Sequence, residues 1–586
     1  MRSLLRHFNA RDWLAVAAAV ILIGLSVWLE LLMPAYMKEI TALIIIPDAA
    51  IADILIAGGK MLACAGASVL VAVLVTVITG YLAADYSFTV RAKLYDAVES
   101  FSMGEINRFS TASLITRSTN DITQVQTIIV FGLLVTVRAP LMAILAVTSI
   151  ADKRGEWTFS AGAAVVLVMI VLAICFIFAH PRFQKIQMLT DNINRITREN
   201  LTGLRVIRAY NAEDYQKAKF EKANEEITKN NMTAHRIMAI MMPSMLLIMN
   251  GLSLVVYWIG AYLIEGAPLL EKKDLFLDMA VFSQYALMVI MAFMMLNMIF
   301  IMGPRAMVAS KRINEVIDTP SSVTDGPGVE DASIQGEIEF RHVSFRYPDA
   351  ADDVLTDISF TAKKGETVAI IGSTGCGKST LINLIPRFYD CTGGEVLVDG
   401  HDVREYTLEQ LHDRIGYIPQ RAVLFSGDIN TNVAMGDNGR GAYTQEDVVR
   451  AVRIAQAQEI VENYPEGYEH FVAQGGTNMS GGQKQRICIA RAVCRKPEIL
   501  IFDDSFSALD YATDRSLRES LKEETAGTTN IIVAQRIGTI KDADQIIVLD
   551  EGRIAGIGKH KYLLENCRIY KEIALSQLSE EELQNA

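Results

Sequence analysis

Six long apolar stretches occupy the first half of the sequence and constrain its fold more than any other feature. Each is at least as long as the roughly 20 residues that cross the ~30 Å hydrocarbon layer of a bilayer. They lie near residues 13–36, 57–83, 129–150, 157–180, 237–264 and 276–304. With 586 residues, of which 51% are hydrophobic, the chain is too long for one domain and too apolar for an ordinary soluble protein. We therefore predict an α-helical transmembrane domain of six spans over residues 1–308.

Cationic side chains predict how the spans are oriented. Arg2, Arg6 and Arg11 precede the first span, and Lys and Arg recur over residues 182–236, between spans four and five. Because cytosolic loops carry an excess of Lys and Arg, we expect these segments and the second half of the chain in the cytosol. Residues 1–12 lack the small-residue cleavage pattern of a signal peptide, so an amphipathic interfacial helix is expected there.

Two polar segments, residues 84–128 and 181–236, are too long for structureless loops and show helical periodicity. We expect them to extend the spans into the cytosol. Residues 309–335 are expected to form a linker rich in Ser, Pro, Gly and Asp. Short Val/Ile-rich strands then alternate with helices, which predicts an α/β domain with a parallel core sheet over residues 336–574, followed by a tail over 575–586.

A phosphate-binding loop begins the chemistry of the second domain. The pattern G-x-x-x-x-G-K-[ST] follows a predicted strand and leads into a predicted helix. It comprises Gly372, Ser373, Thr374, Gly375, Cys376, Gly377, Lys378 and Ser379. Such a loop binds ATP through backbone N–H groups, while its Lys contacts the β- and γ-phosphates and its Ser binds Mg²⁺. Nearby cationic groups and the helix N-terminus further predict a reactive, accessible thiol at Cys376.

The segment Met479-Ser480-Gly481-Gly482-Gln483, downstream of this loop, resembles the signature of the ATP-binding cassette (ABC) transporter family. The resemblance covers nearly the whole chain and implies the exporter-type (type IV) architecture, with six spans followed by an ABC nucleotide-binding domain. With no internal repeat, the chain is similar to a half-transporter that pairs with a second chain. Residues 110–121 and 199–214 resemble the coupling segments of such exporters. The alternative for these segments is a solvated charged helix.

The resemblance also implies roles for individual residues. Tyr347 is expected to stack on adenine, although a lone Tyr is more often a packed strand residue. Thr380 is expected to lie at the nucleotide beside the phosphate loop, and Ser379, Gln420 and Asp503 to bind Mg²⁺. Because this family sandwiches ATP between two cassettes, a further group is expected to serve the partner's ATP. This group consists of Ser480, Gly481, Gly482, Gln483 and Asp510.

Two residues depart from the family pattern at positions that matter for hydrolysis. Asp504 stands where the family has the general base Glu, and Gln535 stands where it has His. An Asp carboxylate ends about 1 Å short of a Glu carboxylate, and a misplacement of this size costs ~100-fold in rate. Gln, unlike His, does not titrate near neutral pH. Either change alone is compatible with drift, but together they predict a degenerate site that hydrolyses weakly.

This pattern resembles one chain of the heterodimeric multidrug-type exporters of the bacterial cytoplasmic membrane. The partner chain would then carry the consensus Glu and His. Export of small amphipathic compounds is the expected function. The alternatives are a peptide, lipid or siderophore transporter on the same fold, and an ATP-gated channel or sensor. A net charge of -12 argues against a nucleic-acid partner.

Two features of the spans bear on the transported compound. A Met-rich stretch around residues 284–302 fits adaptable apolar contacts with a substrate, or ordinary packing against helices and lipid. Arg138 lies inside span three, where a cation requires a partner or a water-filled cavity. We expect it either to form a structural ion pair or to line a cavity.

Overall fold

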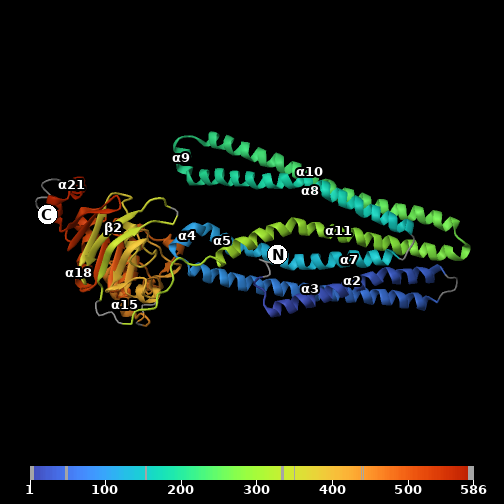
Figure 1. Ribbon diagram of the computed structural model, residues 1–586, viewed down its shortest axis with the longest axis horizontal. Helices are drawn as coiled ribbons and strands as arrows, with labels where there is room; N and C mark the ends of the chain where they lie inside the picture. The colour runs from blue at the N-terminus through green and yellow to red at the C-terminus, as the bar shows by residue number, and fades with distance from the viewer. Residues whose placement is uncertain are drawn as a thin grey trace. The chain divides into compact units, whose positions relative to one another are not determined.

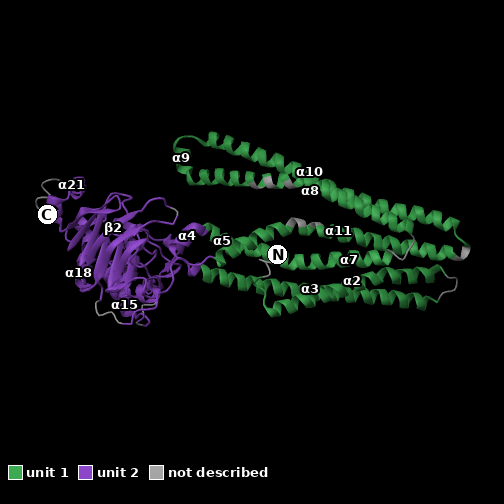
Figure 2. Cartoon of the chain, in the orientation of Figure 1, with its two compact units in different colours: residues 1–97, 112–318 green, residues 98–111, 319–586 purple. Residues whose placement is uncertain are grey.

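The computed structural model describes residues 6–45, 50–151, 155–330, 335–348, 350–436, 439 and 441–578. These residues form two compact units (Figure 2). Unit 1 comprises residues 1–97 and 112–318, and unit 2 comprises residues 98–111 and 319–586.

Unit 1 is entirely helical in the residues described, and six of its helical segments are long and apolar enough to cross a membrane (Figure 1). The prediction of six spans is confirmed. The helices are α2 (Ala10–Ile45), α3 (Ile51–Glu99), α5 (Thr111–Thr116), α6 (Ile122–Thr127), α7 (Leu133–Ala151), α8 (Gly155–Thr202), α9 (Leu204–Ala209), α10 (Glu213–Gly266) and α11 (Leu269–Ile317), with π-helical turns at Arg117–Asp121 and Ile128–Gly132. The predicted interfacial helix lies partly outside the described residues, because only residues 6–12 of it are described.

Most of the apolar surface of the spans is not covered within the chain. The most apolar window of α3 is only 11% buried, whereas that of the segment Glu271–Leu296 in α11 is 50% buried. In the core of unit 1, Trp157 packs on Phe282 with ring centroids 5.7 Å apart, and both side chains are fully buried. The remaining apolar surface requires lipid or another chain to cover it.

Arg138 forms an ion pair inside the spans. Its guanidinium donates to both carboxylate oxygens of Glu30 on α2, at 2.6 and 2.9 Å. The hydroxyl of Ser68 on α3 donates to the same carboxylate at 3.3 Å. The side chains of Glu30 and Arg138 are only 21% and 23% exposed. Of the two roles expected for Arg138, the structure therefore shows the structural ion pair.

Unit 2 is an α/β domain in which the prediction of a parallel core sheet is confirmed. Its strands are β1 (Ile338–Phe345), β2 (Leu355–Ala362), β3 (Thr367–Gly372), β4 (Gly393–Val398), β5 (His401–Asp402), β6 (Ile415–Ile418), β7 (Gly427–Asp428), β8 (Phe471–Val472), β9 (Ile499–Asp503), β10 (Thr529–Val533), β11 (Gln545–Asp550) and β12 (Arg553–Gly558). Its helices are α4 (Met103–Phe109), α12 (Lys378–Asn383), α13 (Leu408–Asp413), α14 (Ile429–Val433), α15 (Gln445–Ile454), α16 (Gln458–Glu462), α17 (Gly481–Cys494), α18 (Tyr511–Glu524), α19 (Ile537–Ile540), α20 (His560–Asn566) and α21 (Arg568–Leu575), with 3-10 turns at Gly467–Glu469 and Gln474–Gly476.

The core sheet has the strand order β12-β11-β3-β10-β9-β6. Strands β11, β3, β10, β9 and β6 are parallel, and β12 pairs antiparallel with β11 at one edge. All five residues of β9 are buried, as expected for a strand covered on both faces. A second, antiparallel sheet has the order β2-β1-β4-β5, and β7 pairs with β8.

Helix α4 belongs to unit 2 although it lies between α3 and α5 in the chain. It begins with a capping box, in which the hydroxyl of Ser102 accepts from the backbone of Gly104 and Glu105 accepts from the backbone N–H of Ser102. Asn107 donates to the hydroxyl of Tyr389 at 3.1 Å. The segment that contacts the cassette is therefore α4, and the coupling segment expected over residues 110–121 is placed about ten residues too late. The S-x-x-E pattern at Ser102 was the missed signal.

Residues 112–121 belong to unit 1 instead, because their charged side chains pair with α11. Arg117 donates to the backbone oxygen of Arg312 at 2.6 Å and to Glu315 at 2.9 Å. Arg312 in turn lies 3.3 Å from Asp121. Since α11 is helical to Ile317, the first nine residues of the predicted linker are part of that helix.

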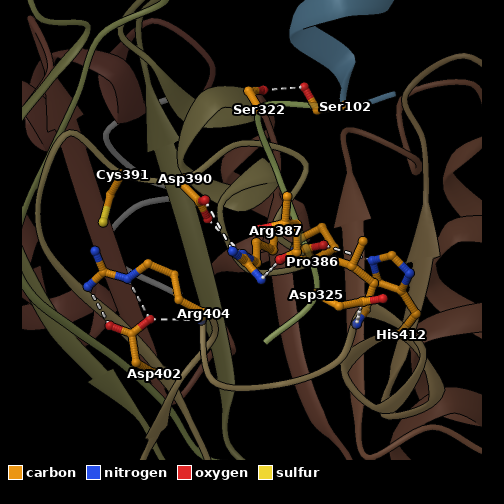
Figure 3. Close-up of polar contacts among 12 residues, drawn as sticks. Ser102, Ser322, Asp325, Pro386, Arg387, Asp390, Cys391, Asp402, Arg404 and His412 are labelled. Carbon is orange, nitrogen blue, oxygen red and sulfur yellow. Dashed lines mark hydrogen bonds and ion pairs between the residues drawn. The ribbon is translucent and has the colours of Figure 1, made fainter. Parts of the chain in front are cut away.

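Residues 322–325 of the linker are bound to the cassette rather than free (Figure 3). Arg387, which is 6% exposed, donates to the backbone oxygen of Thr324 at 2.9 Å and to Asp390 at 2.7 Å. Asp325 accepts from the backbone of Leu408 at the start of α13. The hydroxyl of Ser322 hydrogen-bonds with that of Ser102 at 2.8 Å, so the linker also holds α4.

Replacing Arg387 should release the linker. Arg387→Ala leaves Asp390 without its buried partner and the Thr324 carbonyl without its donor, a loss of about 3 kcal/mol. We expect faster proteolytic cleavage between residues 318 and 330. Arg404→Ala is the matched control, because Arg404 forms a more exposed pair with Asp402 on the same unit. Equal cleavage rates in the two variants would contradict the role assigned to Arg387.

The pair of Glu30 and Arg138 predicts a non-additive pattern in the membrane domain. Arg138→Leu leaves the Glu30 carboxylate unpaired within the spans, at an expected cost of about 1–3 kcal/mol. The double variant Glu30→Leu, Arg138→Leu removes both charges and should melt at a higher temperature than Arg138→Leu alone. Thermal unfolding in detergent measures this. Lys60→Leu, at the more exposed pair with Glu39, is the control; a double variant less stable than Arg138→Leu would refute the pairing.

Candidate functional site

The phosphate loop joins β3 to α12 in a conformation that depends on its glycines. Gly375 and Gly377 have φ values of +86° and +99°, in the left-handed region that favours glycine. A Cβ on Gly377 would also lie 2.8 Å from the Leu355 side chain. Lys378 donates to the backbone oxygens of Gly372 and Ser373 at 2.9 and 2.7 Å, so its ammonium lies folded over the loop.

Cys376 does not fit the expectation of an accessible thiol. The side chain is 4% exposed and belongs to the apolar core beneath the loop. A Cβ on Gly372 would lie 2.6 Å from the Cys376 sulfur, which shows how closely the thiol packs on the loop. The prediction of ready reactivity is therefore wrong for this conformation. Cys376 fills space under the loop.

Two adjacent carboxylates lie at the end of β9 beside the loop: Asp503 is the last residue of the strand, and Asp504 follows it. The Ser379 hydroxyl donates to Asp503 at 2.9 Å, which brings two of the three expected Mg²⁺ ligands together. Asp503 is 6% exposed and Asp504 is 7% exposed. Burial raises the pKa of Asp503, and the charge of Asp504 raises it further, whereas the Ser379 hydrogen bond lowers it. A divalent cation would relieve the repulsion between the two carboxylates.

Tyr417 was missed in the sequence although it stands three residues before Gln420. Its hydroxyl lies 3.1 Å from Asn383 on α12 and 3.5 Å from Asp503. Burial raises the pKa of the Tyr417 hydroxyl far above its ordinary value, and the negative charge of Asp503 adds to this effect. Tyr417 is therefore a neutral donor beside the carboxylate. Only its place on a strand next to Gln420 could have indicated this contact.

The Asp504 carboxylate accepts hydrogen bonds from the side chains of Gln420, which follows β6, and Gln535, which follows β10. Gln535 donates to the Oδ2 of Asp504 at 2.8 Å, and Gln420 donates to the same oxygen at 3.3 Å. Asp504 has a φ of +47°, an uncommon conformation for a residue other than glycine. Its backbone N–H bonds to Val533 at 3.0 Å. Burial raises the pKa of Asp504, while the two amide donors and Lys378 lower it.

Tyr347 contacts α12. Its hydroxyl hydrogen-bonds with that of Thr380 at 3.0 Å, which places both expected nucleotide residues together. The ring is half-buried and meets the Tyr389 ring edge-on, with centroids 5.3 Å apart. Because Asn107 of α4 bonds to the Tyr389 hydroxyl, α4 is connected to the expected adenine site through two tyrosine rings.

The signature forms the start of α17. Ser480 caps this helix by a capping box with Gln483: the Gln483 side chain accepts from the Ser480 backbone at 2.9 Å, and the Ser480 hydroxyl accepts from the Gln483 backbone at 3.3 Å. Ser480 and Gly481 are exposed. A Cβ on Gly482 would lie 3.4 Å from the backbone oxygen of Ala508, so the signature lies beside the loop that leads to Asp510. Asp510 is exposed and caps α18 through Thr513.

Comparison with known proteins agrees with this arrangement. The model of the ABC transporter family matches residues 355–507, and that of the ABC transporter transmembrane region matches residues 14–293. The chain belongs to the ABC transporter family. It is an ATPase-coupled, exporter-type transporter with six spans in the cytoplasmic membrane and a cytosolic ATP-binding domain.

Three similar proteins illustrate the relationship. An uncharacterized ABC transporter ATP-binding protein of Mycobacterium tuberculosis is 38% identical over 524 residues, 89% of this chain and 88% of that protein. The ATP-dependent lipid A-core flippase of Syntrophus aciditrophicus is 29% identical over 525 residues, 88% and 84% of the two chains. The structure of a bacterial Atm1-family ABC exporter with ATP bound matches with a TM-score of 0.80 at 24% identity, over 97% and 99% of the two chains, and thus shares the fold.

The raised pKa of Asp504 predicts a pH-dependent stability effect. A carboxyl group with a raised pKa binds its proton more tightly in the folded protein, so its ionisation destabilises the fold as the pH rises through that pKa. Asp504→Asn keeps an oxygen for the two amide donors and removes the charge. The variant should therefore melt at a higher temperature than the parent at neutral pH, in the absence of nucleotide and Mg²⁺.

The difference should shrink on acidification, as the parent carboxyl becomes protonated. Thermal unfolding at several pH values measures it. Glu523→Gln, which removes an exposed carboxylate of α18, is the control and should show no such trend. A melting difference that grows on acidification would contradict the direction of the shift.

Proposed function

We propose that this chain is one half of a heterodimeric exporter, in which its own ATP site binds ATP with Mg²⁺ but hydrolyses it weakly. Its phosphate loop, Tyr347 and Thr380 bind the nucleotide, while Ser379, Asp503 and Gln420 hold Mg²⁺. Its signature and Asp510 complete the partner's site. The partner supplies the Glu and His that this chain lacks.

The environment of Asp504 is the observation that carries this proposal. Its carboxylate receives both Gln420 and Gln535 on one oxygen, and its backbone is held in a left-handed conformation after β9. A shorter side chain that is held in this way has little freedom to reach an attacking water. The groups that bind charge, by contrast, are all present: Lys378, Ser379 and Asp503 lie together. Binding without efficient turnover follows from this combination.

The exposed signature and the exposed apolar surface of the spans support the proposal that a second chain is present. The signature at Ser480 and Gly481 is open to solvent, although its N–H groups are expected to serve a γ-phosphate. The spans likewise leave most of their apolar surface uncovered within this chain. Two copies of this chain would produce two weak sites, so a partner of different sequence fits better than a homodimer.

One face of α11 supports the proposal that the substrate is amphipathic. Gln284, Met291 and Met298 are exposed and recur at intervals of seven residues, which places them on one side of the helix. Met288 and Met294 instead pack against the core of unit 1. An exposed stripe on the most buried span, formed by flexible Met side chains and one amide, suits an apolar molecule with a polar end.

A lipid substrate is the second candidate, and one specific observation favours it. A relative over 88% of this chain is named as a lipid A-core flippase. A lipid is also an amphipathic molecule, so the same exposed stripe is compatible with it. Transport of labelled lipid and of cationic dyes in vesicles separates the two candidates.

The division of labour between the two sites is tested by ATPase assays of the transporter purified with its partner. Ser480→Ala and Gly481→Asp alter the partner's site, so they should reduce turnover by about 10- to 100-fold. Asp504→Ala alters only the weak site and should reduce turnover less than about twofold.

Nucleotide binding to this chain is measured alongside, because Asp504→Ala should leave it intact while Lys378→Ala should abolish it. Ser507→Ala serves as a matched control, since Ser507 lies near the site and its hydroxyl donates to the backbone oxygen of Asp504. If Asp504→Ala stopped turnover as completely as the signature variants, this chain's site would be catalytic and the asymmetric roles would be wrong.

A further inference from the structure

The loop that carries Gln535 is held by a residue from the C-terminal end of the chain. The side-chain nitrogen of Gln577 donates to the backbone oxygen of Gln535 at 2.7 Å. The side-chain oxygen of Gln577 accepts from the backbone N–H of Ile537 at 2.9 Å. One amide therefore bonds to the two peptide groups on either side of Arg536.

This contact replaces a missing helix cap. Ile537 is the first residue of α19, and its N–H is one of the groups that no partner within the helix can satisfy. Arg536 occupies the N-cap position but makes no side-chain capping bond. Gln577 supplies the acceptor from a distant part of the sequence, so the start of α19 and the carbonyl of Gln535 are fixed together.

Gln577, whose side chain clamps the backbone of Gln535 and Ile537, is itself held by the packed helix α21. Gln577 follows α21, and its backbone bonds to Ala574 at 3.1 Å. Ala574 and Tyr570 on that helix are fully buried, and Leu578 packs against the same core cluster. The segment expected as a tail, residues 575–586, thus contains two residues that contact the cassette, Gln577 and Leu578.

The side chain of Gln535 extends from the clamped backbone to Asp504, to which it donates at 2.8 Å. A chain of contacts therefore runs from Gln577 through Gln535 to the residue after the Mg²⁺-binding carboxylate. We propose that Gln577 is a positioning residue for this chain's ATP site, which holds the Gln535 amide where it reaches the γ-phosphate when ATP is bound. The inference rests on the proposed function, in which this chain's site binds ATP, and adds to it a contact of the Gln535 amide with the γ-phosphate.

The physical reason is preorganisation. A side chain that bonds a phosphate must be held within about 0.5 Å of its place, and a loop that is free in the absence of ligand loses conformational entropy when it binds. Removing the clamp leaves Gln535 chemically intact but increases the freedom of its backbone. The expected result is faster release of ATP from this site.

The experiment measures how long this chain retains ATP in the full-length transporter purified with its partner. Photolabelling with 8-azido-ATP at intervals after a chase with unlabelled ATP gives the lifetime, and the two chains are separated on a gel. Gln577→Ala should shorten the lifetime by about threefold or more. Ser576→Ala is the control, because the Ser576 hydroxyl donates to the backbone oxygen of Ile573 in α21.

A double-mutant cycle separates positioning from general stability. If Gln577 acts through Gln535, then Gln577→Ala should have no further effect in a Gln535→Ala background. A purely structural role would shorten the lifetime by the same factor in both backgrounds. That result, or an unchanged lifetime in Gln577→Ala alone, would overturn the proposal.

Gln577→Glu provides a second variant should Gln577→Ala unfold. It keeps the length of the side chain and the acceptor for Ile537, but it removes the donor to the Gln535 carbonyl. The same cycle with this variant decides the question. The outcome is also distinct from the test of weak hydrolysis: if Asp504→Ala stopped turnover while the cycle stayed non-additive, the weak-site assignment would fail and the positioning role would stand.

Discussion

The parallel pairing of β3, β10, β9 and β6 is the constraint on which the ATP site depends. Because these strands run in the same direction and lie next to one another, their carboxyl ends meet at one edge of the sheet. The phosphate loop follows β3, the paired carboxylates end β9, and Gln535 and Gln420 come shortly after β10 and β6. Residues that are 31, 84 and 124 positions apart in the sequence are thereby brought within hydrogen-bond distance.

Asp504 shows how this convergence creates local strain. A buried carboxylate next to another buried carboxylate is destabilised by desolvation and by repulsion. Its left-handed backbone adds a further cost, which persists only where the surroundings fix it. Here the surroundings consist of the Val533 carbonyl and the two glutamine amides. In the proposed function, a bound Mg²⁺ ion would supply the compensating positive charge.

Local patterns in the sequence predicted the features of the structure that are determined by short segments. The six spans follow from apolar length, and the positions around Lys378 and Asp503 follow from motifs flanked by a strand and a helix. Contacts between distant segments were not predictable in this way. Nothing near Arg138 in the sequence indicates Glu30, and nothing near Gln535 indicates Gln577. Arg387 reads as an ordinary surface cation, yet its burial against the linker makes that segment part of the cassette.

The coupling segment was missed for a related reason. The resemblance to exporter coupling segments favoured residues 110–121, but the charged side chains of Arg117 and Asp121 in this segment pair with residues of α11. Helix α4 uses small polar side chains and a capping box instead.

The difference between binding ATP and hydrolysing it accounts for which residues the proposed ATP site contains. Groups that stabilise bound ATP act on its ground state, so they retain their value whether or not the nucleotide is hydrolysed. A general base contributes only to the transition state. In the proposed heterodimer, a chain whose site holds ATP keeps a first set of groups, which bind the nucleotide. It does not require the second set, which acts in hydrolysis. Lys378, Ser379 and Asp503 belong to the first set, and Asp504 and Gln535 stand at the positions of the second.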